Sequence, residues 1–232
     1  MRLFHETAPF TPAVGRSVPR FDSLGSRLYD GSAMASRALA RTFIPPPDDL
    51  PAQGEWTYEE YCRLPADGWR YEVLRGDLHM TPAPNWGHQQ VVLNFGFLLK
   101  FFLQGAPLGK VAIAPLDVLL PNGLARPVQP DAIFISQERT AIIRENFVEG
   151  APDLVMEVLS PSNWFGDRRE KFEIYAQAGV REYWIAGPKA RTVEIFGLRE
   201  GVYELLGKFG AGERARSEVL PAFAPAIDEI FA

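Results

Sequence analysis

The order of short apolar segments along the chain constrains the fold more than any other feature. Two segments are long enough to form helices of several turns, at about 86–104 and from 167 to just before Gly179. The predicted strands span 69–74, 78–80, 111–114, 117–120, 131–135, 154–159, 182–186, 192–196 and 203–206. Helices and sheets must bury their apolar faces against one another. We therefore expect an α/β fold, with one mixed sheet flanked by helices.

Four local motifs indicate where elements begin or turn. The segment Thr57–Glu60 has the spacing of a capping box and predicts a short helix that runs to Leu64. The segment Arg75–Asp77 lies between two strand-like runs and predicts a hairpin turn. Asn85 is a candidate N-cap for the helix at 86–104, and Asp167–Glu170 is a second capping-box pattern at the start of the later helix.

The N-terminal segment differs from the rest of the chain in composition. Residues 1–47 contain six arginines, no lysine and three acidic residues, a charge of 6 − 3 = +3, without a sustained helical or strand period. We expect 1–50 to be a disordered extension, or to reflect translation from a start upstream of the true one, with Met34 as a candidate start. The folded domain is expected to span 51–232.

The remaining residues are acidic. They carry 24 − 6 = 18 basic and 29 − 3 = 26 acidic side chains, a net charge of −8. This charge argues against a protein that coats nucleic acid nonspecifically, because such binding needs a basic face. The longest apolar run, 91–103, is too short and too polar to span a bilayer. No apolar signal segment follows the start, so we expect a cytoplasmic protein without membrane association.

Single carboxylates interrupt three strands that are otherwise apolar. Glu72, Asp131 and Glu157 each lie among Val, Ile, Leu or Phe residues. An ionised carboxylate in such a setting costs several kcal/mol unless it is paired or bound to a metal. If the three converge from neighbouring strands, a divalent cation is the simplest species that keeps them all ionised. Oxygen ligands without cysteine indicate a hard cation, Mg²⁺ or Mn²⁺.

Five blocks of this sequence resemble the Uma2 family of restriction-endonuclease-like proteins, within the PD-(D/E)XK nuclease superfamily. They read YEVLRGDL, VQPDAIFIS, GAPDLVMEVLSPSN, DRREKFEIYAQAGVREYWIAGP and RTVEIF. The resemblance extends over about residues 55–231. It implies a restriction-endonuclease-like PD-(D/E)XK core and a Mg²⁺-dependent endonuclease that hydrolyses phosphodiester bonds, with DNA as the expected substrate.

The resemblance also implies roles for individual residues. It assigns Asp131 to the "PD" element, Glu157 to the acid of "(D/E)XK" and Glu72 to an upstream acid. All three are expected to be catalytic and to bind the metal.

The lysine of the motif is not at its usual place. Position 159, two residues after Glu157, is a leucine. The resemblance favours Lys171, on the following helix, as the catalytic lysine that orients the attacking water. The alternative is an i,i+4 ion pair between Asp167 and Lys171 that only stabilises the helix.

Further polar residues are candidates for the edge of this site. His88, Arg168 and Arg169 are expected as phosphate or site-edge contacts, with an ordinary structural or solvated role as the alternative. Asp153 shares strand parity with Glu157 and is expected near the rim of the site. Asp117 is expected to be a structural partner.

Two questions remain open on the sequence. The helix at 86–104 is apolar on most of its circumference, which predicts a homodimer. The chain is expected to bind nucleic acid, but the absence of lysine at position 159 and the acidic charge leave two alternatives to a nuclease. One is a catalytically silent nucleic-acid-binding or assembly module, and the other is a metal hydrolase that acts on another substrate.

Overall fold

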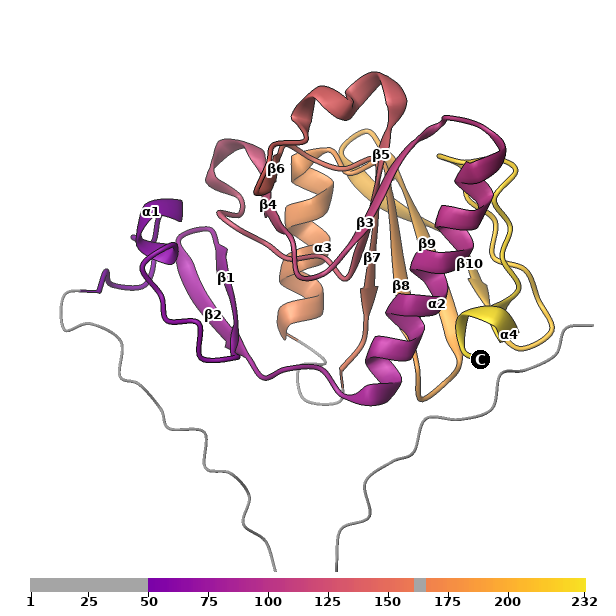
Figure 1. Ribbon diagram of the computed structural model, residues 1–232, viewed down its shortest axis with the longest axis horizontal. Coiled ribbons are helices and arrows are strands. Elements are labelled where there is room, and N and C mark those ends of the chain that lie inside the picture. Colours follow the sequence, from indigo (N-terminus) through magenta and orange to yellow (C-terminus); the bar gives the residue numbers. More distant parts are fainter. Residues whose placement is uncertain (1–49, 161–165) are drawn as a thin grey trace, which may run out of the picture. The chain divides into compact units, whose positions relative to one another are not determined.

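The computed structural model describes residues 50–160 and 166–232 (Figure 1). The predictions made for the N-terminal extension fall outside these residues. The helices are α1 (Tyr58–Tyr61), α2 (Trp86–Phe102), α3 (Gly166–Ala178) and α4 (Ile227–Ile230). The strands are β1 (Arg70–Leu74), β2 (Asp77–Thr81), β3 (Gly109–Ile113), β4 (Asp117–Leu119), β5 (Ala132–Ser136), β6 (Phe147–Glu149), β7 (Leu154–Val158), β8 (Glu182–Gly187), β9 (Thr192–Arg199) and β10 (Val202–Phe209).

A six-stranded mixed sheet forms the centre of the fold, in the order β10-β9-β8-β7-β5-β3. β7 and β8 pair in parallel and are connected through α3, whereas the other neighbours pair antiparallel. The remaining strands form two small sheets, the antiparallel hairpin β1-β2 and the parallel pair β4-β6. The predicted α/β fold with a mixed sheet flanked by helices is therefore confirmed.

Helices cover both faces of the sheet (Figure 1). On one face, Ile174 and Tyr175 of α3 pack in a cluster with Val155 of β7 and Ile185 of β8. On the other face, α2 and α4 pack against residues of opposite strand parity, such as Met156. The alternation along each strand, in which successive side chains point to opposite faces, produces these two cores.

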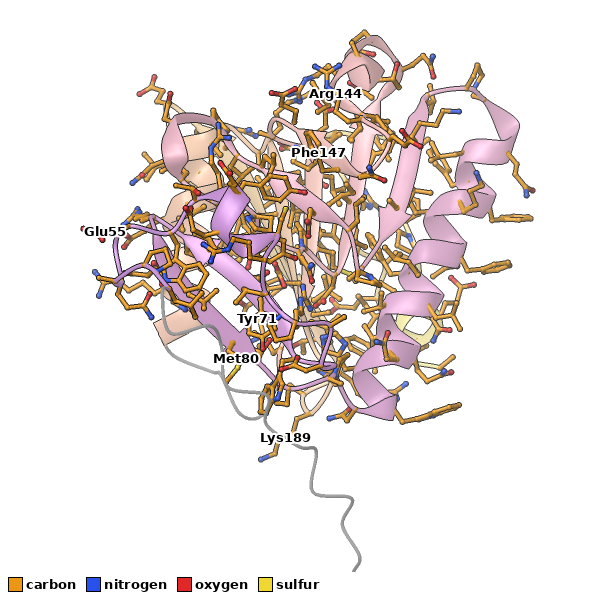
Figure 2. All side chains as sticks on the ribbon, turned by 60° about the vertical axis from the view of Figure 1, so that its left-hand side comes forward. Glu55, Tyr71, Met80, Arg144, Phe147 and Lys189 are labelled. Carbon is orange, nitrogen blue, oxygen red and sulfur yellow. The ribbon has the colours of Figure 1, made fainter. Side chains whose placement is uncertain are left out.

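The α2 helix is apolar on two sides, but the sheet covers only one of them. Val91, Val92, Phe95 and Leu99 are buried against the sheet. The opposite side of α2 carries exposed apolar side chains, and Figure 2 shows side chains of this helix that project away from the sheet. These exposed residues are Trp86, Leu93, Phe97 and Phe101.

The β1-β2 hairpin closes with the two-residue turn Arg75-Gly76, as the sequence predicts. Both residues have positive φ, 53° and 87°, which is the backbone of a type I′ turn. The Gly54 backbone lies against Gly76, where a side chain would clash. The sequence led us to expect Glu72 on a strand neighbouring those of Asp131 and Glu157. This expectation is wrong, because the hairpin is separate from the six-stranded sheet.

Element boundaries follow the local motifs with two differences. Thr57 and Glu60 form the predicted capping box of α1, and the Asn85 side chain caps α2. However, α1 ends at Tyr61, earlier than predicted, and α3 begins at Gly166, so Asp167 lies in its first turn rather than at the N-cap. Within the described part of the chain, no helix has the length and apolarity needed to cross a bilayer.

Candidate active site

The register of the central sheet brings Asp131 and Glu157 together. β5 and β7 pair antiparallel with Ala132 opposite Met156, so one further step places Asp131 opposite Glu157. Directly opposite residues of an antiparallel pair point to the same face of the sheet. The Val158 amide donates a hydrogen bond of 2.8 Å to Asp131 Oδ2, which fixes the carboxylate at this edge.

Helix α3 contributes a lysine and a tyrosine to the same place. Lys171 Nζ lies 2.9 Å from Glu72 Oε2 and 3.3 Å from Glu157 Oε1, so this cation links two of the predicted acids. The Tyr175 hydroxyl donates a hydrogen bond of 2.6 Å to Glu157 Oε1. Residues four apart lie on one face of a helix, which is why both side chains reach Glu157.

The hairpin contributes an arginine beside Glu72. Arg70 and Glu72 are two residues apart on β1 and therefore point to the same face. Arg70 NH1 donates a hydrogen bond of 2.9 Å to Asp131 Oδ1, and Arg70 NH2 lies 3.7 Å from Glu72 Oε1. Glu72 Oε1 also accepts a hydrogen bond of 2.7 Å from the backbone amide of Gln129. This contact connects the hairpin to the chain just before β5.

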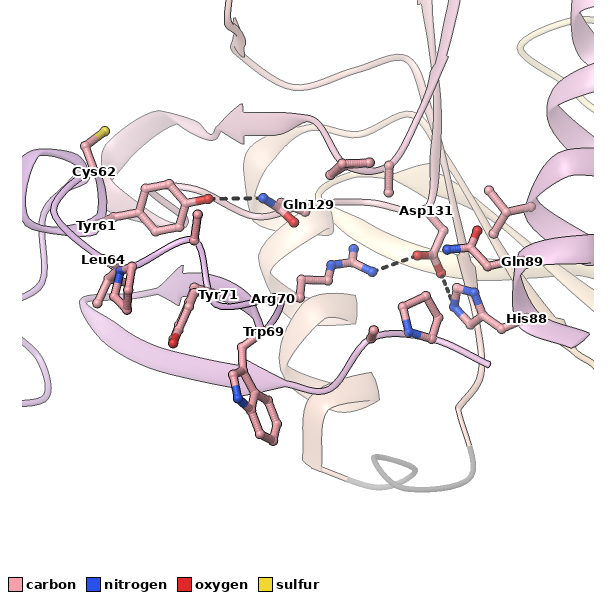
Figure 3. A pocket seen from close by; sticks show the side chains of 18 residues that line it. Tyr61, Cys62, Leu64, Trp69, Arg70, Tyr71, His88, Gln89, Gln129 and Asp131 are labelled. Atoms are coloured by element: carbon pink, nitrogen blue, oxygen red, sulfur yellow. Dashed lines mark hydrogen bonds and ion pairs between the residues drawn. The ribbon is translucent and has the colours of Figure 1, made fainter. Parts of the chain in front are cut away.

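The first turn of α2 approaches Asp131 from another side. His88 Nε2 lies 3.1 Å from Asp131 Oδ2 (Figure 3). The Asn85 cap, which accepts a hydrogen bond from the His88 amide, positions this turn. The structure thus places His88 at the edge of the cluster formed by Glu72, Asp131, Glu157 and Lys171, which is called the acidic cluster below.

The three acids of the acidic cluster differ in how their charge is compensated. Burial by itself would raise the pKa of Asp131, but hydrogen bonding to His88 and the charge of Arg70 outweigh it and hold the pKa at about 2. Burial would also raise the pKa of Glu72, but the positive charges of Lys171 and Arg70 outweigh this effect and lower its pKa.

Glu157 behaves in the opposite way. Burial raises the pKa of its carboxyl group to about 7; Lys171 opposes this shift, and the negative charges of Asp131 and Glu72 add to it. The neighbouring Tyr175 hydroxyl also has a raised pKa, because it is buried and lies beside this carboxylate. Glu157 is therefore the member of the acidic cluster whose negative charge is least compensated.

Arg168 and Arg169 were both predicted as phosphate or site-edge contacts, and the structure describes the side chain of Arg169 only. The Arg169 side chain is 84% exposed and its Nε lies 3.2 Å from Glu173 Oε1, so it extends into solvent along the helix and not toward the acidic cluster. The prediction for the Arg168 side chain falls outside the described residues.

Asp153 is not at the rim of the site, contrary to expectation. It lies just before β7, at the other end of this strand from Glu157, where its Oδ1 contacts Arg139 and Arg181 at 2.9 and 3.0 Å. The Ser136 amide donates to its other oxygen. Strand parity indicated the face of the sheet correctly, but four residues along a strand correspond to about 13 Å.

Asp117 has the environment of a structural partner, as predicted. Its carboxylate accepts hydrogen bonds from the hydroxyls of Tyr58 and Tyr61 and from the Gln129 side-chain amide. These contacts fasten α1 to β4.

The acidic cluster does not form a three-carboxylate metal site as it stands. Among the described residues, no group of three or more His, Cys, Asp or Glu side chains has a geometry suited to a metal ion. Lys171 lies against both Glu72 and Glu157, and Arg70 occupies one oxygen of Asp131. Glu72 is thus placed to hold the ammonium group of Lys171 rather than a metal ion.

In the pair Asp131 and Glu157, the oxygen that suits a divalent cation is Glu157 Oε2, because both Asp131 oxygens already have partners: Arg70 at Oδ1, and the Val158 amide and His88 at Oδ2. No described residue donates a hydrogen bond to Glu157 Oε2, and 12% of the Glu157 side chain is exposed, so this oxygen is open to a ligand. Burial and the negative charges of Asp131 and Glu72 make the ionised form of Glu157 unfavourable, and a bound cation would stabilise that ionised form. Carboxylate oxygens are the donors that Mg²⁺ and Mn²⁺ prefer.

A cavity of about 430 Å³ opens beside the acidic cluster (Figure 3). Asp131, Arg70 and His88 form one end of its wall. Aromatic and small residues of the α1-β1 connection form much of the remainder, including Tyr61 and Trp69. The cavity gives a ligand access to Asp131.

Comparisons with known proteins identify the family and the fold. The family model described as "Uma2: Putative restriction endonuclease" matches residues 58–228. The chain belongs to the Uma2 family. The resemblance stated from the five sequence blocks is therefore confirmed, and the family indicates a restriction-endonuclease-like nuclease.

A solved structure shows the same fold as this Uma2 protein. It is described as a putative nuclease belonging to DUF820 from Anabaena variabilis, with a TM-score of 0.62 and 16% sequence identity. The similarity covers 76% of this chain and 97% of the other. The predicted restriction-endonuclease-like core is thereby confirmed. A search of curated proteins found no match.

Sequence reasoning missed three residues that complete the site. Arg70, Tyr175 and Gln129 contact members of the acidic cluster. Arg70 and Tyr175 were detectable in principle, because Arg70 shares strand parity with Glu72 and Tyr175 is one helical turn after Lys171. The Gln129 amide contact depends on tertiary packing between the hairpin and the chain before β5, for which the sequence carries no local signal.

Proposed function

We propose that this protein is an endonuclease that hydrolyses phosphodiester bonds of DNA with the help of a divalent cation. One observation carries the proposal: Asp131 and Glu157 face each other across β5 and β7, with Lys171 Nζ 3.3 Å from Glu157 Oε1. Two carboxylates and an ammonium group at one sheet edge are suited to hold a cation and to direct a water molecule at a phosphate.

Asp131 and Glu157 would hold the ion, Mg²⁺ in the first place and Mn²⁺ as a substitute. When bound, this ion supplies a Lewis acid that polarises the phosphoryl group. Glu157 must be ionised to take part, and its pKa of about 7 makes cation binding stronger as the pH rises through neutrality.

Lys171 orients the attacking water and opposes the negative charge that grows on the phosphate. Its ammonium group is held by Glu72, with Nζ 2.9 Å from Oε2. Glu72 therefore acts as a positioning residue for Lys171. Tyr175 holds Glu157 Oε1 and leaves Oε2 open on the other side.

A catalytically silent nucleic-acid-binding or assembly module is the second candidate. The observation in its favour is the ion pairing of the acidic cluster, in which Lys171 and Arg70 already compensate Glu72 and Asp131. A module that had lost catalysis would be stable with such pairs and would need no cation.

Cleavage assays separate the two candidates. Plasmid DNA and single- and double-stranded oligonucleotides are incubated with the purified protein in Mg²⁺, Mn²⁺ or EDTA. We expect cleavage with either cation, none in EDTA, and loss of at least about 100-fold in Lys171→Ala, as for removal of a group that stabilises the transition state. Glu173→Gln is the matched control on α3, because Glu173 pairs with the exposed Arg169 and lies outside the acidic cluster.

Two results would count against the nuclease. Cleavage that Lys171→Ala leaves unchanged would mean that the activity does not come from this site. Absence of cleavage for every nucleic acid and cation, with a protein that still unfolds cooperatively, would favour the silent module.

A further inference from the structure

The cavity beside Asp131 has features of a ligand site that cation binding does not explain. Its volume of about 430 Å³ lies within the range of small-molecule pockets, roughly 300–1,000 Å³. It extends from the acidic cluster toward α1 and the start of β1, where its wall includes Tyr61, Trp69 and Gln129. A ligand that filled it would therefore have one end at Asp131 and the other among aromatic side chains.

The end near Asp131 is suited to an anion. Arg70 Nε and NH2 and His88 Nδ1 are buried and have no hydrogen-bond partner among the described residues. His88 is only 8% exposed. Buried polar atoms are almost always paired, and Arg70 NH2 has only the 3.7 Å ion pair with Glu72 Oε1, so the Arg70 guanidinium has donors left for an anion. Such a guanidinium is a favourable partner for a phosphate group. His88 already faces Asp131 through Nε2 and is not counted as a phosphate donor.

The other end offers a hydrogen-bond acceptor whose orientation is fixed. Gln129 Nε2 donates to Asp117 Oδ1 at 2.8 Å and to the Tyr61 hydroxyl at 3.1 Å. An ionised carboxylate only accepts hydrogen bonds, so the amide nitrogen must face Asp117. Gln129 Oε1 is therefore left as an acceptor, and no described residue donates to it. Amino and imino groups of nucleobases are donors of the kind that this oxygen would take.

Aromatic side chains line the same end of the cavity as Gln129. Trp69 is half-buried in the wall of the cavity and stacks on no other ring among the described residues. Tyr61 is fixed by its hydrogen bonds and by stacking on Tyr58, with ring centroids 5.7 Å apart. Bases stack on such side chains irrespective of their sequence.

We infer that this cavity binds one unpaired nucleotide next to the phosphate to be cleaved, so that the substrate class is single-stranded DNA or an unpaired end. This inference rests on the proposed function and specifies its substrate. A base that is stacked and paired within a duplex cannot enter a pocket of this size, and an unpaired base enters without the cost of flipping. The net charge of −8 outside residues 1–47 agrees with a contact that covers few phosphates.

Binding without cleavage tests the inference. A single-stranded oligonucleotide that carries one 2-aminopurine is titrated with the protein in EDTA, and the same strand is titrated as a blunt duplex. We expect quenching of 2-aminopurine by stacking, and binding of the single strand at least about tenfold tighter than binding of the duplex. Trp69→Ala should weaken single-strand binding roughly tenfold, the loss of one base–aromatic stack.

Two further variants keep the test sharp. Ala83→Leu narrows the cavity from an exposed position without removing a contact, and should weaken single-strand binding even if Trp69→Ala proves poorly folded. Leu205→Ala is the control, because it removes an exposed apolar side chain of β10 that neither lines the cavity nor lies on α2, and it should leave binding unchanged.

The outcomes separate this inference from the proposed function. Tight single-strand binding that depends on the cavity, without cleavage in Mg²⁺ or Mn²⁺, would refute the nuclease and leave the nucleotide site standing. Equal binding of strand and duplex, or single-strand binding that Ala83→Leu leaves unchanged, would overturn the nucleotide site even if duplex DNA is cleaved.

Discussion

The uncompensated charge of Glu157 predicts a pH-dependent gain in stability when that charge is removed. The folded protein raises the pKa of this carboxyl group from 4.5 to about 7. A group whose pKa is raised on folding binds more protons in the folded than in the unfolded state between these two values. The free energy of unfolding therefore falls as the pH rises through this window.

The magnitude follows from the linkage relation. Ionisation of Glu157 costs the folded state roughly 1 kcal/mol at pH 5 and about 3 kcal/mol at pH 8, for a pKa that moves from 4.5 to about 7. Glu157→Gln removes this cost, and its side-chain oxygen still accepts the hydrogen bond from Tyr175. The stability of the variant relative to wild type should thus increase by roughly 2 kcal/mol between pH 5 and pH 8.

Urea unfolding in EDTA at several pH values between 5 and 8 measures this difference. Glu72→Gln is the matched control, because the pKa of Glu72 is lowered on folding. A lowered pKa contributes stability that is present above the unfolded pKa and is lost as the pH falls through the folded pKa. Glu72→Gln should therefore be less stable than wild type from pH 6 to pH 8. Because the charge of Glu72 helps to raise the pKa of Glu157, this deficit should shrink as the pH rises, and Glu72→Gln should not become more stable than wild type as Glu157→Gln does.

Addition of Mn²⁺ at pH 8 extends the experiment to the cation. A ligand that binds only the folded state stabilises it by mass action. Wild type should gain stability and Glu157→Gln should not, because the variant lacks one of the two ligands. The reasoning is refuted if Glu157→Gln is destabilised by the same amount at pH 5 and pH 8, since that would mean a carboxylate fully satisfied by its neighbours.

Three further predictions concern single contacts. Asp131→Asn should lower the stability by roughly 2 kcal/mol at pH 7, because the pKa of Asp131 falls from 3.8 to about 2 on folding; equilibrium unfolding should show this loss disappearing as the pH approaches 2. Tyr175→Phe should cost about 1 kcal/mol for the lost hydrogen bond and raise the pKa of Glu157 further, which would move the pH profile of cleavage upward. The homodimer expected from the sequence stays a prediction, and the exposed face of α2 is its natural interface. Sedimentation at micromolar concentration should give a dimer for wild type and a monomer for Phe97→Ser, and a monomeric wild type would contradict it.

The sequence predicted those parts of the fold that local patterns determine. The capping box at Thr57, the N-cap at Asn85 and the turn at Arg75-Gly76 all lie where their residue types require them. In contrast, β6 was not predicted. It has only three residues, and it pairs in parallel with β4, almost thirty positions earlier in the chain. Such pairing depends on how the loops pack, for which a short strand carries no pattern of its own.

The acids of the site were predicted better than their partners. Isolated carboxylates in otherwise apolar strands identified Asp131 and Glu157, and the register of β5 and β7 places the two opposite each other. The sequence could not show that Arg70 and Lys171 compensate the other charges, since these cations come from β1 and α3. We expected a divalent cation to keep all three acids ionised, whereas Lys171, Arg70 and His88 already lower the pKa of Glu72 and Asp131 without one.

A carboxylate inside an apolar strand is not by itself evidence for a metal site. Glu182, in β8, is almost fully buried, yet Trp184 Nε1 donates to its Oε1 and two backbone amides donate to its Oε2. Asp153 is satisfied by Arg139 and by the Ser136 amide. Both acids stabilise the fold through such contacts and need no cation. Glu157 differs because burial and like charges raise its pKa while one oxygen remains open. A cation is therefore indicated by the negative charge that the described neighbours of Glu157 leave uncompensated, and not by the number of acids.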